Sequence, residues 1–377
     1  MTTVHAPTPP TTPDLLDAVA SIASGLRTTA PGFDRTGELD VEAFERLRAA
    51  GVTAALVPRV FGGAGVTHAE MGEILRVLGA SDPAVAVTLA MHSHLVAAQV
   101  WRHQHGIDAE PFLRKVAAGA IAISTGASDW IASNGTATKV EGGFRVSARK
   151  SPASGCEVGD LLVTSVHYPG AEPKVIHCAI PFTAEGLTIE RTWDTLGLRA
   201  TGSHTVVLNE VFVPEAAVSL TRPATEWHPV WNTILGAALP LIMAAYVGIA
   251  DAAVERAIEL ASGRDDDHVH QLAGEMLNAY TVGADTVRAM FLDADDLRFD
   301  NSNAIAARML TRKTTATDAL IHTVRLAIEL VGGVGFTRAS ALERLYRDIH
   351  GSLFHPLPRA KQTRLTGRVA LGLAPVA

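Results

Sequence analysis

Gly332-Gly333-Val334-Gly335-Phe336 precedes the charged segment Leu342-Glu343-Arg344-Leu345-Tyr346-Arg347-Asp348, which leads into His350-Gly351-Ser352-Leu353-Phe354-His355-Pro356. These residues bear on both the fold and the chemistry that we expect. The glycines predict a turn between two helices, since glycine readily adopts the backbone conformations that end a helix. The last segment carries histidines and no carboxylate, which limits the acid–base chemistry available to it.

Apolar residues recur with a helical period on both sides of this stretch. The pattern predicts helices at 234–262, 268–297, 304–330, 339–349 and 361–372. From Pro13 to about Gly119 the pattern is also helical. N-cap residues are expected there at Asp40 and Thr67, and a long apolar helix is expected to start at Asp82-Pro83.

Between Ala120 and about Val218 the apolar period changes to two, which is typical of strands. Strands are expected at 140–146, 161–165, 175–180 and 205–208, separated by Gly/Pro/Asn turns. The sequence therefore predicts a mainly α protein with an inserted β domain. Its expected parts are a disordered tail (1–13), an N-terminal helical domain (14–119), a central β-barrel domain (120–222) and a C-terminal helical bundle (223–377).

The composition is that of a mildly acidic globular enzyme. Hydrophobic residues make up 47% of the 377 residues, charged residues 19%, and the net charge is -7. A nucleic-acid surface would normally carry a basic excess, so no nucleic-acid partner is expected. The apolar run 234–253 contains Pro240 and Gly248, which favours a helix buried in a bundle over a membrane span. The two cysteines, Cys156 and Cys178, and a start without signal-peptide order indicate reduced thiols in a cytoplasmic protein.

Five motifs occur in the order and spacing of one protein family. They are Val57 to Gly65 (VPRVFGGAG), Ser124 to Asp129 (STGASD), Trp193 to Ser203 (WDTLGLRATGS), Val211 to Pro214 (VFVP) and the stretch from Gly332 to Asp348. In this combination the chain resembles the acyl-CoA dehydrogenase superfamily over nearly its whole length. The resemblance implies a helical flavoprotein that holds an isoalloxazine between helical layers and a small β-barrel.

The resemblance also indicates which residues would hold the flavin. The loop at 124–129 offers hydroxyls and backbone N–H groups that suit the pyrimidine edge of a flavin. The candidate cofactor-binding residues are Thr125, Ser128, Ser154, Gly155, Trp193, Arg199, Thr201, Gly332 and Gly333. No spacing of histidine, cysteine or carboxylate residues suits a metal site, so no metal is expected.

The segment after Arg347-Asp348 departs from the dehydrogenase pattern. Dehydrogenases usually carry there the glutamate that removes the substrate α-proton, whereas Gly351 to His355 include no carboxylate. A minority of relatives place this glutamate on an earlier helix, near Ala238 in this chain, and no carboxylate is found there either. Without a positioned base, dehydrogenation of an acyl thioester should lose several orders of magnitude in rate.

The loop at 150–161 and two histidines resemble instead the reduced-flavin monooxygenases of the superfamily, the branch of dibenzothiophene monooxygenase. In that branch a serine that matches Ser154 lies close to the reactive edge of the flavin, and histidines that match His94 and His355 stand around it. An imidazole titrates near neutrality, so it can stabilise a peroxide on the flavin or deprotonate the substrate. We therefore expect His355, His94 and Ser154 to be catalytic, while His92 fits packing and function equally well.

The identity of the flavin stays open between FMN and FAD. Most FAD-binding relatives use an arginine-containing segment and a glutamine to reach the dinucleotide. This chain has the acidic segment 263–267 and Glu329 in those places. A carboxylate beside a pyrophosphate is unfavourable, so FMN, or FAD held more loosely, fits the sequence.

Three functions fit the sequence. We favour a monooxygenase that uses reduced flavin from a separate flavin reductase and acts on a small organic or carrier-bound substrate. The first alternative is an acyl-CoA or acyl-carrier dehydrogenase with a relocated base, for which His355 is the candidate. The second is a non-catalytic partner subunit. The long apolar helices, notably 234–253, suggest a homotetramer or homodimer.

Overall fold

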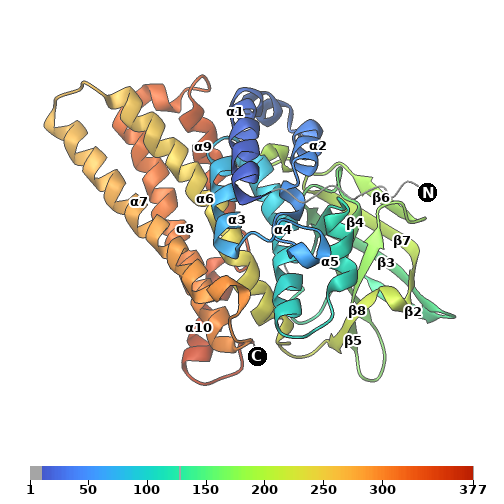
Figure 1. The fold of residues 1–377 in the computed structure, drawn as a ribbon. Coiled ribbons are helices and arrows are strands. Elements are labelled where there is room, and N and C mark those ends of the chain that lie inside the picture. The colour runs from blue at the N-terminus through green and yellow to red at the C-terminus, as the bar shows by residue number, and fades with distance from the viewer. Residues whose placement is uncertain (1–10, 127–128, 377) are drawn as a thin grey trace.

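The structure, a computed structural model, describes residues 11–126 and 129–376. A group of helices comes first, a β-sheet follows, and a second group of helices completes the chain (Figure 1). The helices of the first group are Thr12–Thr36 (α1), Val41–Ala49 (α2), His68–Gly79 (α3), Pro83–Gln104 (α4) and Glu110–Ala117 (α5).

Side-chain caps explain where several of these helices begin. The Thr67 hydroxyl accepts a hydrogen bond from the N–H of Glu70, whose carboxylate accepts from the N–H of Thr67. The carboxylates of Asp40 and Asp82 accept from first-turn N–H groups of α2 and α4. Such bonds satisfy donors that the start of a helix leaves unpaired. The starts predicted at these three residues are therefore confirmed.

The strands, which come between the two helical groups in the chain, form one sheet that lies beside the first group (Figure 1). They are Ala122–Ser124 (β1), Thr136–Val140 (β2), Gly143–Ala153 (β3), Leu161–Tyr168 (β4), Lys174–Pro181 (β5), Leu187–Glu190 (β6), His204–Pro214 (β7) and Val218–Pro223 (β8). Their order is β6-β7-β3-β2-β4-β5-β8, and β1 runs parallel to β4. The strand expected at 140–146 is instead the hairpin between β2 and β3, because Gly142 turns the chain with a φ of 74°.

The second helical group consists of Val230–Ala261 (α6), Asp267–Ala294 (α7), Asn303–Val331 (α8), Ala341–Ile349 (α9) and Arg359–Ala370 (α10). Helix α6 lies at the centre and packs against α3, α4, α7 and α8. Glycines make its crossing with α3 unusually close. A Cβ at Gly79 would lie 2.3 Å from the carbonyl oxygen of Ala245, and a Cβ at Gly248 would lie 2.1 Å from that of Arg76. Any larger residue would push the two helices apart.

Three helical stretches are long and apolar enough to cross a membrane by length and composition alone: Pro83–Gln104, Val230–Ala261 and Asn303–Phe336. The fold buries 94% of the apolar window in each of the first two, so their apolar length serves packing. The third has only 39% of its window buried. The cysteines expected as free thiols, Cys156 and Cys178, are both unpaired and buried.

Candidate active site

A cavity of about 350 Å³ lies where the sheet, α4, α6 and the segment after α9 meet. This volume falls within the usual range of small-molecule and cofactor sites. The wall on the sheet side is rich in hydroxyl groups, and it includes Ser124, Thr125, Ser154, Thr195, Thr201 and Ser203. The wall formed by α6 is apolar, and it includes Ile234, Leu235, Ala238, Leu239 and Ile242. The cavity can therefore hold a polar group on one side and an apolar group on the other.

A chain of hydroxyl groups determines how Ser154 meets the cavity. The Thr201 hydroxyl donates to the carbonyl oxygen of Leu198 at 3.0 Å. Thr201 Oγ1 can then only accept from the Ser203 hydroxyl at 2.7 Å, and Ser203 Oγ accepts in turn from the Ser154 hydroxyl at 2.8 Å. Because each hydroxyl has one proton to give, Ser154 presents lone pairs to the cavity. It is thus an acceptor for an N–H or O–H group of a bound molecule.

His94 lies on α4, and only 8% of its surface is exposed. Its Nδ1 lies 3.3 Å from the carbonyl oxygen of Ala90, which can only accept, so Nδ1 carries a proton. Burial lowers the pKa of His94 to about 4, so the ring is uncharged at neutral pH. The unprotonated Nε2 of this lining residue is therefore a second hydrogen-bond acceptor at the site.

His355 follows α9 and lies half-buried in the cavity wall. Burial lowers its pKa to about 3, and the positive charge of Lys313 acts in the same direction. An imidazole with this pKa is uncharged at neutral pH, and it can accept or donate one hydrogen bond at each nitrogen. Both candidate catalytic histidines thus act as neutral groups.

The cavity has no acidic side chain among the described residues that line it. The positions at which dehydrogenases carry their glutamate, near Ala238 and from Gly351 to His355, contribute a methyl group, a glycine, an aromatic ring and an imidazole to the wall. The neutral histidines are weak bases, because their pKa values are depressed. The site therefore lacks a strong base for removing an α-proton from an acyl thioester.

Two buried cations hold the loop that follows β1 against the sheet. Lys150 Nζ lies 2.8 Å from Asp129 Oδ2, and both side chains are buried. The Asp129 carboxylate also accepts from the hydroxyls of Ser133 and Ser165. The Arg222 guanidinium donates to the carbonyl oxygens of Asp129 and Ile131. These bonds position Ser124, Thr125, Gly126 and Trp130, the part of this segment that lines the cavity.

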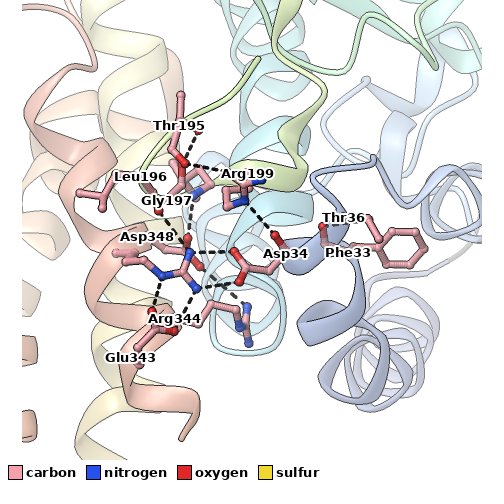
Figure 2. Close-up of polar contacts among 12 residues, drawn as sticks. Phe33, Asp34, Thr36, Thr195, Leu196, Gly197, Arg199, Glu343, Arg344 and Asp348 are labelled. Atoms are coloured by element: carbon pink, nitrogen blue, oxygen red, sulfur yellow. Dashed lines mark hydrogen bonds and ion pairs between the residues drawn. The ribbon is translucent and has the colours of Figure 1, made fainter. Parts of the chain in front are cut away.

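A second polar cluster joins the Trp193–Arg199 segment to both helical groups (Figure 2). The Arg347 guanidinium donates two hydrogen bonds to the Asp34 carboxylate, at 2.9 and 2.6 Å. Arg199 donates to the carbonyl oxygen of Asp34 and to the side chain of Asp194. Asp348 Oδ1 accepts from the N–H of Leu198 at 2.6 Å. This cluster fixes the Leu196–Leu198 part of the cavity rim.

Asp348 should make stability depend on pH. Burial raises its pKa from 3.8 to about 7, so between these values the folded protein retains a proton that the unfolded chain has lost. The free energy of unfolding contributed by this group should therefore fall as pH rises from about 4 to 7, by at most about 1.4 kcal/mol per pH unit. Asp348→Asn keeps an oxygen for the Leu198 N–H and should lack this slope. Urea unfolding of both proteins at pH 4.5, 5.5 and 7 measures it, and parallel curves would refute it.

The structure brings most of the predicted site residues to one cavity: His94, Thr125, Ser154, Trp193, Thr201 and His355 all line it. Ser128 lies outside the described residues. Gly155, Arg199, Gly332 and Gly333 do not line the cavity. The N–H of Gly155 donates to the carbonyl oxygen of Thr201, and the guanidinium of Arg199 is used in the polar cluster around Asp34. Gly332 and Gly333 are exposed at the end of α8.

Sequence reasoning missed the buried groups that support the cavity. In the sequence, Lys150 and Asp129 belong to two separate loop segments, and nothing there indicates that they form an ion pair. His92 proves to be structural, since its Nε2 donates to the carbonyl oxygen of Thr53 and its Nδ1 accepts from the N–H of Ala122. Across the described residues, no group of three or more histidine, cysteine or carboxylate side chains could hold a metal ion.

Two family profiles match the chain, "Acyl-CoA dehydrogenase, N-terminal domain" at residues 14–120 and "Acyl-CoA dehydrogenase, C-terminal domain" at residues 230–353. The putative acyl-CoA dehydrogenase YdbM of Bacillus subtilis is 26% identical, with 90% of this chain and 92% of that protein covered. The L-evernosamine nitrososynthase of a Micromonospora species is 28% identical over 98% of this chain and 93% of its own. The oxygenase component of the FADH(2)-dependent resorcinol hydroxylase of a Rhizobium species is 26% identical over 91% of each chain.

Solved structures are similar over almost the whole chain. The nitrososynthase from Micromonospora carbonacea var. africana superposes with a TM-score of 0.88 at 25% identity, covering 98% of this chain and 99% of that one. The structure of KijD3 in complex with FMN and dTDP-3-amino-2,3,6-trideoxy-4-keto-3-methyl-D-glucose superposes with a TM-score of 0.87 at 24% identity, covering 98% and 96%. The predicted fold class, helical N- and C-terminal parts with a β part between them in the chain, is confirmed.

Proposed function

Since the chain belongs to the acyl-CoA dehydrogenase family, we propose that it is a flavin-dependent monooxygenase rather than a dehydrogenase. The observation that carries the proposal is the cavity lining, which has two neutral histidines and, among the described residues, no carboxylate. Relatives with matching lengths include a nitrososynthase and a resorcinol hydroxylase. The cavity lining and these relatives support a small amine or phenol as the substrate, because oxygenation of either needs no abstraction of an α-proton.

The hydroxyl-rich wall fits a flavin. Thr125, Ser154 and Thr201 offer hydroxyls at one side of the cavity, and the indole of Trp193 is held there by a bond from its Nε1 to the carbonyl oxygen of Leu198. Polar hydroxyls beside an aromatic plane suit the edge and the face of an isoalloxazine. When bound in its reduced form, a flavin supplies the electrons that activate O₂ for transfer of one oxygen atom.

The apolar wall would hold the substrate. Helix α6 presents aliphatic side chains and the indole of Trp231 there, and the exposed rim carries Leu196 and Phe354, which are 67% and 72% exposed. An uncharged substrate loses little hydration free energy when it binds against such a wall. A charged substrate would lose much more. Water is excluded by the same apolar surface, which protects reactive oxygen species from side reactions.

The histidines would handle the protons. Because Nδ1 of His94 donates to Ala90, its Nε2 is free to accept a hydrogen bond from a substrate O–H or N–H group. His355, in the segment that follows α9, can accept or donate a hydrogen bond at its ring nitrogens. Neutral imidazoles suit this task because they do not carry a charge into the apolar cavity.

We favour FMN over FAD as the flavin. Glu329 forms an exposed ion pair with Arg325, one helical turn earlier on α8, close to the exposed Gly332 and Gly333. A carboxylate at this end of α8 would repel the pyrophosphate of FAD. The remaining expectations, a separate flavin reductase, a cytoplasmic location and a homotetramer or homodimer, stay predictions.

The function is tested by giving the protein chemically reduced FMN or FAD, then ¹⁸O₂, with a panel of small amines, phenols and acyl-CoA thioesters. We expect an amine or phenol product that carries one ¹⁸O atom and is formed faster with reduced FMN. Oxidation of an acyl-CoA with an artificial electron acceptor would instead identify a dehydrogenase. Failure to bind either flavin, measured by fluorescence quenching, would favour a non-catalytic subunit.

Ser203→Ala should change which redox state of the flavin is preferred. Without Ser203 the Ser154 hydroxyl has no acceptor in the protein and can turn its proton to the cavity. A reduced isoalloxazine carries N–H groups where the oxidised form has bare nitrogens, so the ratio of the Kd for reduced FMN to that for oxidised FMN should rise about tenfold. Anaerobic titrations with both forms measure the ratio. The control is Ser219→Ala, an exposed hydroxyl outside the cavity lining, and equal ratios in both variants would contradict the expected acceptor role.

A further inference from the structure

Tyr246 lies in the middle of α6 and is fully buried, yet its hydroxyl has no hydrogen-bond partner among the described residues. A buried hydroxyl without a partner loses the hydrogen bonds that it makes to water in the unfolded chain. Such groups are rare in folded proteins, and each one calls for a physical explanation. A phenylalanine would fill the same space without this cost.

The surroundings of the hydroxyl point to the cavity. The ring of Tyr246 meets the ring of His355 edge to face, with 5.5 Å between the ring centroids and 65° between the planes. A Cβ built on Gly351 would lie 2.8 Å from the Tyr246 hydroxyl oxygen. Gly351 and His355 both line the cavity, so the hydroxyl lies directly behind this part of its wall.

The protonation states of the two groups are complementary. Burial and the negative charge of Asp348 on α9 raise the pKa of Tyr246, so the phenol keeps its proton. Burial, together with Lys313 on α8 and His94 on α4, lowers the pKa of His355, so the imidazole stays neutral. A neutral phenol donates well to the bare nitrogen of a neutral imidazole. Within the described part of the chain, the His355 ring has no other hydrogen bond that would fix its tautomer.

We propose that Tyr246 is a positioning residue for His355: its hydroxyl donates through one ordered water to one ring nitrogen of the imidazole. That nitrogen then carries no proton, so the other nitrogen presents an N–H group to the cavity. A fixed partner on one nitrogen determines the tautomer of a histidine and the direction in which it donates. The use of this N–H in catalysis rests on the proposed function, whereas the contact itself does not.

The test is Tyr246→Phe, which removes only the hydroxyl, in protein labelled with ¹⁵N-histidine. The two ring nitrogens of His355 are identified by the resonances that disappear in His355→Asn, and their ¹⁵N shifts report the tautomer. We expect a single tautomer in the wild-type protein and a shift toward the other tautomer in Tyr246→Phe, with and without saturating FMN. The Tm should stay within about 2 °C of wild type, since no bond within the protein is lost.

The matched control is Tyr280→Phe. The Tyr280 hydroxyl donates to Asp251 and accepts from Arg76, so this variant should lower the Tm and leave the His355 resonances unchanged. Unchanged His355 shifts in Tyr246→Phe would overturn the proposal, whatever happens to the Tm. A fall in Tm as large as that of Tyr280→Phe would overturn it too, because the hydroxyl would then have a partner elsewhere in the core. The spectra without FMN separate this outcome from a failure of the proposed function.

Discussion

Replacing Lys150 by methionine is expected to lower the free energy of unfolding by about 3–5 kcal/mol, because it leaves the Asp129 carboxylate buried without its cation. The two side chains are 1% and 8% exposed, and the carboxylate lies 2.8 Å from the ammonium group. Hydrogen bonds from Ser133 and Ser165 remain, but hydroxyl groups carry no charge to balance that of Asp129. Equilibrium unfolding in urea measures the loss.

The neighbouring residue supplies a matched control for this experiment. Arg149 forms an ion pair with Glu190, but these side chains are 60% and 45% exposed. Arg149→Met should therefore cost less than about 1 kcal/mol. If the two variants lose equal stability, then burial of the Lys150–Asp129 pair is not what holds this region together.

The Lys150 variant should also weaken flavin binding. Asp129 belongs to the segment that contains Thr125 and Trp130, two residues of the cavity wall. When the ion pair is lost, this segment keeps the bonds from Arg222 to the carbonyl oxygens of Asp129 and Ile131, but the buried charge of Asp129 loses the cation that holds it against the sheet. A variant that lost stability but bound FMN as tightly as the wild type would show that the wall does not depend on this pair.

His355→Asn is expected to reduce kcat by about 10²–10⁴-fold, the usual effect of removing a positioned acid or base. Asparagine keeps a polar side chain of similar size but cannot exchange a proton near neutral pH. The Kd for FMN should change little, because the hydroxyl-rich wall stands on the sheet side of the cavity. Turnover is measured with the substrate found in the ¹⁸O₂ panel, and binding is measured by fluorescence quenching.

The control for this prediction is His105→Asn. His105 is exposed, stacks on Trp101 and does not line the cavity, so this variant should keep its activity. A His355→Asn protein with full kcat would remove His355 from the proposed mechanism. A protein with normal kcat but a much higher Kd for FMN would assign His355 to cofactor binding instead.

The helices were predictable because their signals are local. The caps at Asp40, Thr67 and Asp82 and the helical period of apolar residues act over a few neighbouring positions, so they can be seen without the fold. The strand boundaries were less accurate. The glycine turn at 141–143 is among the turns that the sequence predicts, but the strand expected over 140–146 runs across it, whereas the turn separates β2 from β3.

The buried polar groups could not be predicted, because their partners are distant in sequence. Lys150 meets Asp129, Asp348 meets Leu198, and Tyr246 meets His355 only when separate elements pack together. In the sequence Tyr246 is one member of a long apolar run, where any aromatic residue would look the same. A depressed or raised pKa likewise depends on burial, which no sequence motif shows.

Residue patterns alone indicate the order of helices and strands and the resemblance to the family. They also show that no carboxylate stands at the two places where dehydrogenases carry their base. These features depend on the identity of residues and on local periods. The fold is needed to see which candidate residues share one cavity, that Ser154 faces it as an acceptor, and that His94 and His355 are neutral there. Those properties arise because the sheet, α4, α6 and the segment after α9 pack together. This packing brings residues that are distant in sequence into contact and shields them from water.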